Sequence, residues 1–176
     1  QKVCCPLNHM TNISIAFSVL LGSTWLGIAA FLFSPAAAQD ITGQPHIVDG
    51  DTIKIAGERI RLHGIDAPER RQTCRRGGEE YACGIEATKA LSALMGGHGV
   101  ACRAVDRDRY GRTIAKCFVG DRDINEWMVR EGWAVAYRKD STDYAPAEDE
   151  ARRENRGLWA GVFMLPWDWR RKKRAK

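Results

Sequence analysis

RIRLHGIDAPE, residues 59–69, is the stretch of the sequence that decides the fold. Its first part, 59–65, is short and rich in β-branched and apolar residues, which predicts a strand with one buried face. Arg61 and Ile65 then share one face of that strand, and Ile60 and Leu62 lie on the opposite face. A guanidinium in this setting needs an anionic partner, and Asp66 follows the strand directly. The stretch therefore predicts a strand that carries a charged site at its end.

Further short strands and several helices are predicted around this stretch. The strands are β-branched and separated by turns such as Asp-Gly, and they cover 46–49, 52–56, 100–105 and 113–119. Composition and capping residues predict helices over 84–95, 124–131 and 146–155, the second of them capped by Asp123 before it and Gly132 after it. Together with 59–65 these elements predict an α+β domain with a small barrel of five strands and three helices.

Composition limits the domain count and the class of partner. A chain of 176 residues with 44% hydrophobic content can bury one core and is too short for two. The net charge of +5 and the pI near 9.0 favour polyanionic partners, either nucleic acid or an anionic membrane surface.

The N-terminal region is typical of an export signal. Residues 13–33 carry no charge, and the small residues 36–38 follow them as an Ala-x-Ala cleavage site. We therefore expect residues 10–38 to be a signal peptide, cleaved after Ala38, and residues 1–9 to lie upstream of the true start. The alternative is an uncleaved membrane anchor through 13–33. Cleavage predicts a secreted or periplasmic protein with no stable membrane association.

Four cysteines remain after cleavage: Cys74, Cys83, Cys102 and Cys117. An even number in an exported chain favours disulfides over zinc, and four cysteines allow three connectivities. Cys102 and Cys117 lie symmetrically about the turn at 109–110, 7 residues before it and 7 after it. This symmetry predicts a bridge or contact between Cys102 and Cys117, and by elimination a bridge between Cys74 and Cys83.

Chemistry is concentrated in three clusters: DGDT at 49–52, RLHGIDAPE at 61–69, and DRYGR at 108–112. The first and the third, taken alone, are ordinary turn sequences, whereas the middle cluster joins a strand arginine to the acids Asp66 and Glu69 and is harder to dismiss. Together they place hard oxygen donors, which Ca²⁺ prefers, near arginines that can bind phosphate oxygens in a bidentate manner. The combination indicates phosphodiester chemistry.

In this order the clusters resemble the staphylococcal nuclease (thermonuclease) family, whose pattern is Asp-Gly-Asp-Thr, then Arg-x4-Asp-x-Pro-Glu, then Asp-x-Tyr-Gly-Arg. The resemblance runs from about residue 44 to residue 159. It implies an OB-fold barrel in a nuclease domain over 39–160, and Ca²⁺-dependent hydrolysis of DNA and RNA that leaves 3′-phosphates. A monomer is expected. The alternative is a catalytically silent member that serves as a nucleic-acid-binding or adaptor module.

The same resemblance implies a calcium site. Asp51 and Asp66 would be its carboxylates, and Ala67 would bind through its backbone carbonyl. The family often has threonine at the position of Ala67, but a backbone ligand tolerates alanine.

The resemblance also implies which residues act on the substrate. Arg61 and Arg112 would hold the scissile phosphate, and Glu69 would position or deprotonate the attacking water. Arg109 and Tyr110 would contact another phosphate of the nucleotide.

The sequence departs from the family pattern elsewhere too, and its four cysteines are foreign to the type member of the family. The loop before Asp108 is shorter, and Tyr137 matches only loosely the tyrosine that flanks a base. Residues 161–176 form a basic tail, expected to be solvated, although two neighbouring tryptophans give it the means to stack on bases.

We expect N-terminal sequencing of the exported protein to begin at Gln39, because the Ala-x-Ala site follows the apolar run. Finding Met10 or the apolar segment on the exported protein would show an anchor instead.

Overall fold

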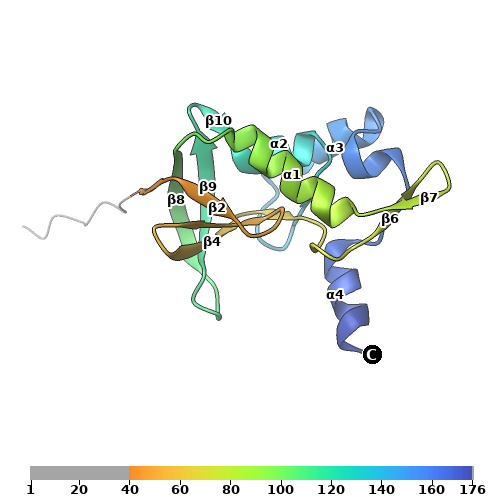
Figure 1. Ribbon diagram of the computed structural model, residues 1–176, viewed down its shortest axis with the longest axis horizontal. Coiled ribbons are helices and arrows are strands. Elements are labelled where there is room, and N and C mark those ends of the chain that lie inside the picture. The colour runs from red at the N-terminus through yellow and green to blue at the C-terminus, as the bar shows by residue number, and fades with distance from the viewer. Residues whose placement is uncertain (1–39, 176) are drawn as a thin grey trace, which may run out of the picture. The chain divides into compact units, whose positions relative to one another are not determined.

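The computed structural model describes residues 40–175, and its main sheet has seven strands. The order is β1 (Ile41–Gly43), β8 (Val100–Arg107), β9 (Thr113–Val119), β4 (Glu58–Leu62), β3 (Thr52–Ile55) and β2 (Pro45–Ile47), with β10 (Arg122–Asp123) paired to β9. β4 and β9 run parallel, and the other pairs are antiparallel. The strand predicted over 59–65 is divided: its first part, β4, lies in the middle of the sheet (Figure 1), whereas Ile65 belongs to the separate strand β5 (Ile65–Asp66).

Two small ladders and four α-helices complete the fold. β5 (Ile65–Asp66) pairs with β11 (Val135–Ala136), and β6 (Cys74–Arg76) pairs with β7 (Glu79–Tyr81). The helices are α1 (Cys83–Met95), α2 (Ile124–Arg130), α3 (Ala145–Arg153) and α4 (Pro166–Arg174), with a 3₁₀ turn η1 (Gly157–Ala160) between the last two.

The α+β class is confirmed, but the expected count of five strands and three helices is wrong. Between residues 40 and 175 no pairing joins β1 to β2, so the sheet does not close into a barrel. β1 and β10 were missed because strands of three and two residues are too short to show an alternating pattern. The additional helix, α4, lies in the stretch expected to be a solvated tail.

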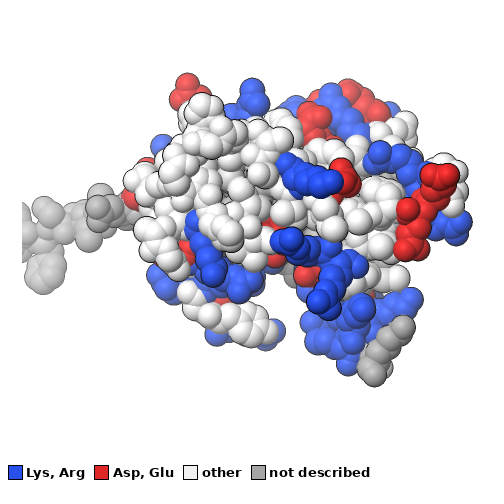
Figure 2. Space-filling model, viewed as in Figure 1, with Lys and Arg blue, Asp and Glu red and all other residues white. Residues whose placement is uncertain are grey.

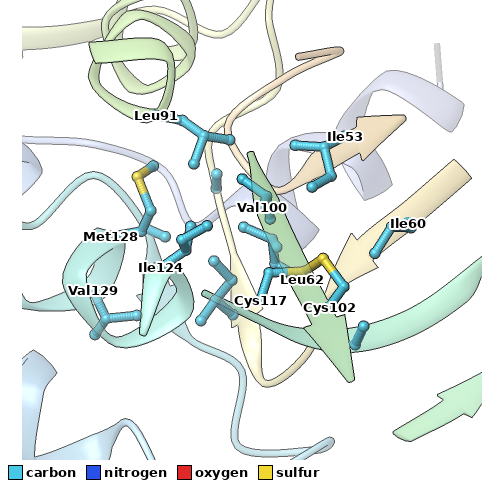
Figure 3. Close-up of a cluster of buried hydrophobic side chains, with 14 of the residues drawn as sticks. Ile53, Ile60, Leu62, Leu91, Val100, Cys102, Cys117, Ile124, Met128 and Val129 are labelled. Atoms are coloured by element: carbon cyan, nitrogen blue, oxygen red, sulfur yellow. A yellow bond between two sulfur atoms is a disulfide. The ribbon is translucent and has the colours of Figure 1, made fainter. Parts of the chain in front are cut away.

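The main core lies between the sheet and two helices. Leu91 of α1 and Met128 of α2 face Val100 and Leu62 of the sheet, all of them at most 2% exposed (Figure 3). Burying side chains of this size contributes about 1.5–3 kcal/mol each.

Polar contacts fix α2 on the sheet. The Asp123 side chain accepts a hydrogen bond from the Glu126 N–H at 2.9 Å, which confirms the predicted N-cap. Asn125 is fully buried; it accepts from the Cys117 N–H at 3.1 Å and donates to the His63 carbonyl at 2.9 Å. This side chain ties α2 to β9 and to the turn that precedes the charged site.

Both predicted disulfides are present. Cys102 and Cys117 are directly opposite in the β8–β9 ladder, with Cα atoms 4.1 Å apart (Figure 3). Nearer the turn the register is centred on Tyr110, where Arg107 pairs with Thr113, and an irregularity between Ala104 and Asp106 shifts it so that the two cysteines meet. Cys74 and Cys83 join β6 to the first residue of α1. The first bridge lies in the main core, and the second lies in a smaller core with Val135 and Leu158.

The segment after α3 is packed against the domain. Phe163, Leu165 and Trp167 lie against the smaller core, and the Trp167 ring is 5.5 Å from the Tyr137 ring. Residues 161–165 therefore lead the chain to a fixed starting point for α4.

No helix within residues 40–175 has the length and apolar character that a membrane crossing requires. The predicted signal peptide and its cleavage site lie outside the described residues.

Replacing Cys102 and Cys117 together with alanine should lower the free energy of unfolding by about 3 kcal/mol, the chain-entropy value for a loop of this length. The bridge closes a separation of 15 residues. Urea denaturation without reductant measures the change, and loss of the difference in reducing buffer is the control. Equal stability of variant and wild type under oxidising conditions would contradict the prediction.

Candidate active site

A cleft of about 600 Å³ collects most of the predicted site residues from separate parts of the chain. Its lining includes Asp51, Arg61, Glu69, Arg109, Tyr110, Arg112, Tyr137, Arg170 and Arg174. Asp66 and Ala67 lie buried at its floor, in contact with lining residues. The three sequence clusters thus meet in one place.

Arg61 links the two predicted metal carboxylates. One terminal nitrogen lies 3.5 Å from Asp51 Oδ2, and the other donates to Asp66 Oδ1 at 3.2 Å. Its second terminal nitrogen also donates to the Ile65 carbonyl at 3.3 Å. The anionic partner that the sequence predicted for this strand arginine is therefore a pair of aspartates.

Neighbouring groups orient the Asp51 carboxylate. The Thr52 hydroxyl donates to Oδ1 at 2.9 Å, and the Ala67 N–H donates to Oδ2 at 3.3 Å. The second contact joins the 49–52 loop to the loop after β5. Asp51 and Asp66 are 5% and 0% exposed, so these few contacts replace nearly all of their hydration.

Burial and charge act in opposite directions on these acids. Burial raises the pKa of Asp49 to about 7, and the neighbouring Asp51 charge adds to the effect. Burial also opposes ionisation of Asp51, but Arg61 and the hydrogen-bond donors outweigh it and hold the pKa of Asp51 below its usual range. For Asp66 burial prevails and raises the pKa, although Arg170 and Arg61 act against it.

The donor set fits a calcium ion in part. The buried carboxylates of Asp51 and Asp66 both contact the Arg61 guanidinium, and the Ala67 N–H donates to Asp51. Among residues 40–175 no group of three His, Cys, Asp or Glu side chains is gathered as a metal site. A Ca²⁺ ion here would be held by Asp51, Asp66, a backbone carbonyl and water, which is within its usual range of oxygen ligands.

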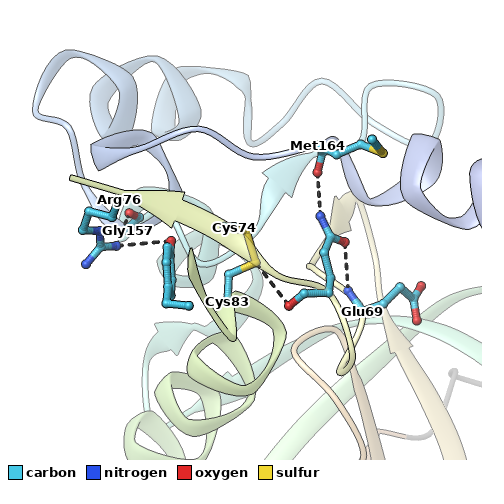
Figure 4. The surroundings of a disulfide bond; sticks show 8 residues. Glu69, Cys74, Arg76, Cys83, Gly157 and Met164 are labelled. Atoms are coloured by element: carbon cyan, nitrogen blue, oxygen red, sulfur yellow. Dashed lines mark hydrogen bonds between the residues drawn. A yellow bond between two sulfur atoms is a disulfide. The ribbon is translucent and has the colours of Figure 1, made fainter. Parts of the chain in front are cut away.

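The loop that carries Glu69 is held by a residue that sequence reasoning missed. Gln72 is fully buried; its side-chain oxygen accepts from the Glu69 N–H at 3.3 Å and its amide donates to the Met164 carbonyl at 2.6 Å (Figure 4). A Cβ on Gly84 would lie 1.8 Å from the Glu69 carbonyl oxygen, so only glycine allows α1 to approach this loop. The Cys74–Cys83 bridge closes the segment that follows this loop.

The turn at 108–112 presents the second arginine. Arg112 Nε donates to Asp108 Oδ2 at 2.7 Å, and the Arg112 and Tyr110 N–H groups donate to the other carboxylate oxygen at 3.0 and 2.9 Å. The Arg109 guanidinium lies 4.9 Å from the centre of the Tyr110 ring, which is 71% exposed. Asp108, which sequence reasoning left without a role, thus orients the turn.

Arg170 of α4 is the largest departure from expectation. Its two terminal nitrogens donate to the two oxygens of Asp66 at 2.9 and 2.8 Å, and one of them also donates to Glu69 Oε1 at 2.8 Å. The helix start at Pro166 is a local signal for α4. No local signal indicates a contact between residues 104 apart.

Comparison with known proteins gives a family match and several relatives. A family model described as a staphylococcal nuclease homologue matches residues 59–161. The chain is 38% identical to the succinoglycan biosynthesis protein ExoI of Rhizobium meliloti, over 86% of this chain and 81% of that protein. It is 35% identical to an uncharacterized endonuclease of Escherichia coli O157:H7, over 85% and 98%. It is also 38% identical to the probable staphylococcal-like nuclease CAN2 of Oryza sativa subsp. japonica, over 66% of this chain and 30% of that one.

The three motifs meet in one cleft, and the family match over residues 59–161 covers two of them, at 61–69 and 108–112. Two of the relatives are at least 35% identical over about 85% of this chain. On these grounds the chain belongs to the staphylococcal nuclease family.

Proposed function

We propose that this nuclease-family protein is a secreted, Ca²⁺-dependent phosphodiesterase that cuts DNA and RNA and leaves 3′-phosphates. The observation that carries the proposal is the convergence of Arg61, Arg112 and Glu69 in one cleft above the buried pair Asp51 and Asp66. A silent binding module has no need to keep this complete set. The protein would act as a monomer, with no stable membrane association after its signal peptide is removed.

Two arginines supply the charge that phosphodiester hydrolysis requires. Asp108 holds Arg112 through Nε, and within residues 40–175 the terminal nitrogens of Arg112 have no hydrogen-bond partner. They are therefore free to bind phosphate oxygens, and Arg61 lines the same cleft. Fixed guanidinium groups stabilise the negative charge that grows on these oxygens in the transition state.

The proposed role of Glu69 is to act on water. Its side chain is one-third exposed and lines the cleft, while its backbone is fixed through Gln72. It would orient or deprotonate a water molecule for in-line attack, and expulsion of the 5′-oxygen leaves a 3′-phosphate. Calcium, when held by Asp51, Asp66 and the Ala67 carbonyl, would add positive charge next to the phosphate.

The outer part of the cleft suits a polynucleotide. Arg59, Arg109 and Arg174 add cations to its lining, and Tyr110 offers an exposed ring for stacking or contact with a second phosphate. These contacts distinguish neither base nor sugar, which supports activity on both DNA and RNA.

Purified protein should degrade plasmid DNA and RNA in calcium and lose this activity with a chelator. Arg112→Ala should lower turnover about 100-fold to 1,000-fold, as for loss of one preorganised donor, with little loss of affinity. Arg112→Lys should be nearly as impaired because it lacks the planar fork. Arg122→Ala, an exposed arginine that does not line the cleft, is the control. Wild-type turnover by Arg112→Ala at saturating substrate and calcium would refute the assigned site.

Asp51→Asn should weaken calcium binding, because it removes one of two carboxylates, and part of the activity should return at higher calcium. The calcium dependence of the initial rate measures this. A loss of activity that no calcium concentration relieves would assign Asp51 a role other than metal binding.

A further inference from the structure

The position of α4 relative to the cleft is set at its N-terminal end. Trp167 packs against the Tyr137 ring, and Gln72 holds the Met164 carbonyl just before the helix. Residues four apart share a helix face, so Arg170 and Arg174 project on the same side, and both line the cleft. Figure 2 shows Lys and Arg gathered over this helix.

Arg170 makes the strongest kind of ion pair with a predicted metal ligand. Its guanidinium takes both oxygens of Asp66, which is fully buried, and reaches Glu69 as well. A bidentate contact fixes both distance and orientation. Arg61 also donates to Asp66 Oδ1, one of the two oxygens that Arg170 binds. The Asp66 carboxylate therefore accepts hydrogen bonds from two guanidinium groups.

A calcium ion needs the same oxygen atoms. It binds carboxylate oxygen at about 2.3–2.6 Å and carries two positive charges, whereas both oxygens of Asp66 already accept hydrogen bonds from Arg170. Like charges at such a distance repel strongly where water is excluded. We infer that Arg170 is a further residue of the site, an intramolecular competitor of calcium for Asp66 that sets the calcium concentration the protein requires. This inference rests on the calcium dependence proposed above.

Competition has a quantitative consequence. The apparent Kd for calcium equals the intrinsic Kd divided by the fraction of molecules in which Asp66 is free. If Arg170 occupies Asp66 in about nine molecules of ten, its removal tightens calcium binding about tenfold.

Isothermal titration of the full chain with calcium chloride, without nucleic acid, tests this. Arg170→Ala should bind calcium about tenfold more tightly or better. Arg174→Ala removes the same charge from the same cleft lining, and Arg171→Ala removes it from a side chain that is 75% exposed and paired with Asp168. Both controls should stay within about twofold of wild type because long-range effects of exposed charges are screened.

The outcomes separate the two proposals. Unchanged or weaker calcium binding by Arg170→Ala, or equal tightening by Arg174→Ala, would overturn the competition and leave calcium dependence intact. Absence of calcium binding to every variant and to the wild type would overturn the calcium dependence itself, and the competition with it.

A measurement on the wild type avoids any folding defect of Arg170→Ala. The guanidinium resonance of Arg170 in ¹⁵N-arginine-labelled protein can be assigned by its absence from Arg170→Lys. It should shift and broaden as calcium saturates the site, because the group leaves Asp66. A resonance that stays unchanged at saturating calcium would refute the competition.

Discussion

Two buried carboxylates that share Arg61 are the constraint on which the rest of the structure depends. Asp51 and Asp66 are buried, and a buried charge without a compensating partner destabilises a fold by several kcal/mol. Arg61 can meet both because it lies on β4, between the loop that carries Asp51 and the short strand that carries Asp66. The central position of β4 in the sheet fixes that geometry.

Each further part of the site fixes one group around this pair. Thr52 and the Ala67 peptide orient Asp51, Gln72 and the contact at Gly84 hold the Glu69 loop, and Asp108 aims Arg112. The two disulfides secure the elements beneath: one ties β8 to β9 and the other closes the loop after Glu69. The cleft is thus made of loops held by a rigid frame, an arrangement that suits preorganised electrostatic catalysis.

Sequence reasoning succeeded where the structural cause is local. Alternation of Ile60 and Leu62 around Arg61 predicted the central strand, spacing about the turn at 109–110 predicted the Cys102–Cys117 bridge, and Asp123 predicted the start of α2. The site motifs also converge as the family pattern implied.

Sequence reasoning failed where a contact joins residues that are far apart in the chain. The Gln72 amide donates a hydrogen bond to a carbonyl 92 residues away, and Arg170 pairs with a carboxylate 104 residues away. The residues next to either partner in the sequence do not indicate these contacts. A run of five basic residues is ordinarily a solvated surface, and only the packing of Trp167 and the acids in the cleft make it part of the site.

The Asp66–Arg170 pair also has a consequence for the order of events during synthesis. Chains emerge from the ribosome N-terminal end first, at about 5–20 residues per second, and a contact between distant residues must await the later one. β4 and β5 are therefore made well before the arginine that covers their buried carboxylate. Until α4 has been made and has docked, Arg61 is the guanidinium that balances the two acids, and the wall of the cleft that carries Arg170 cannot form earlier.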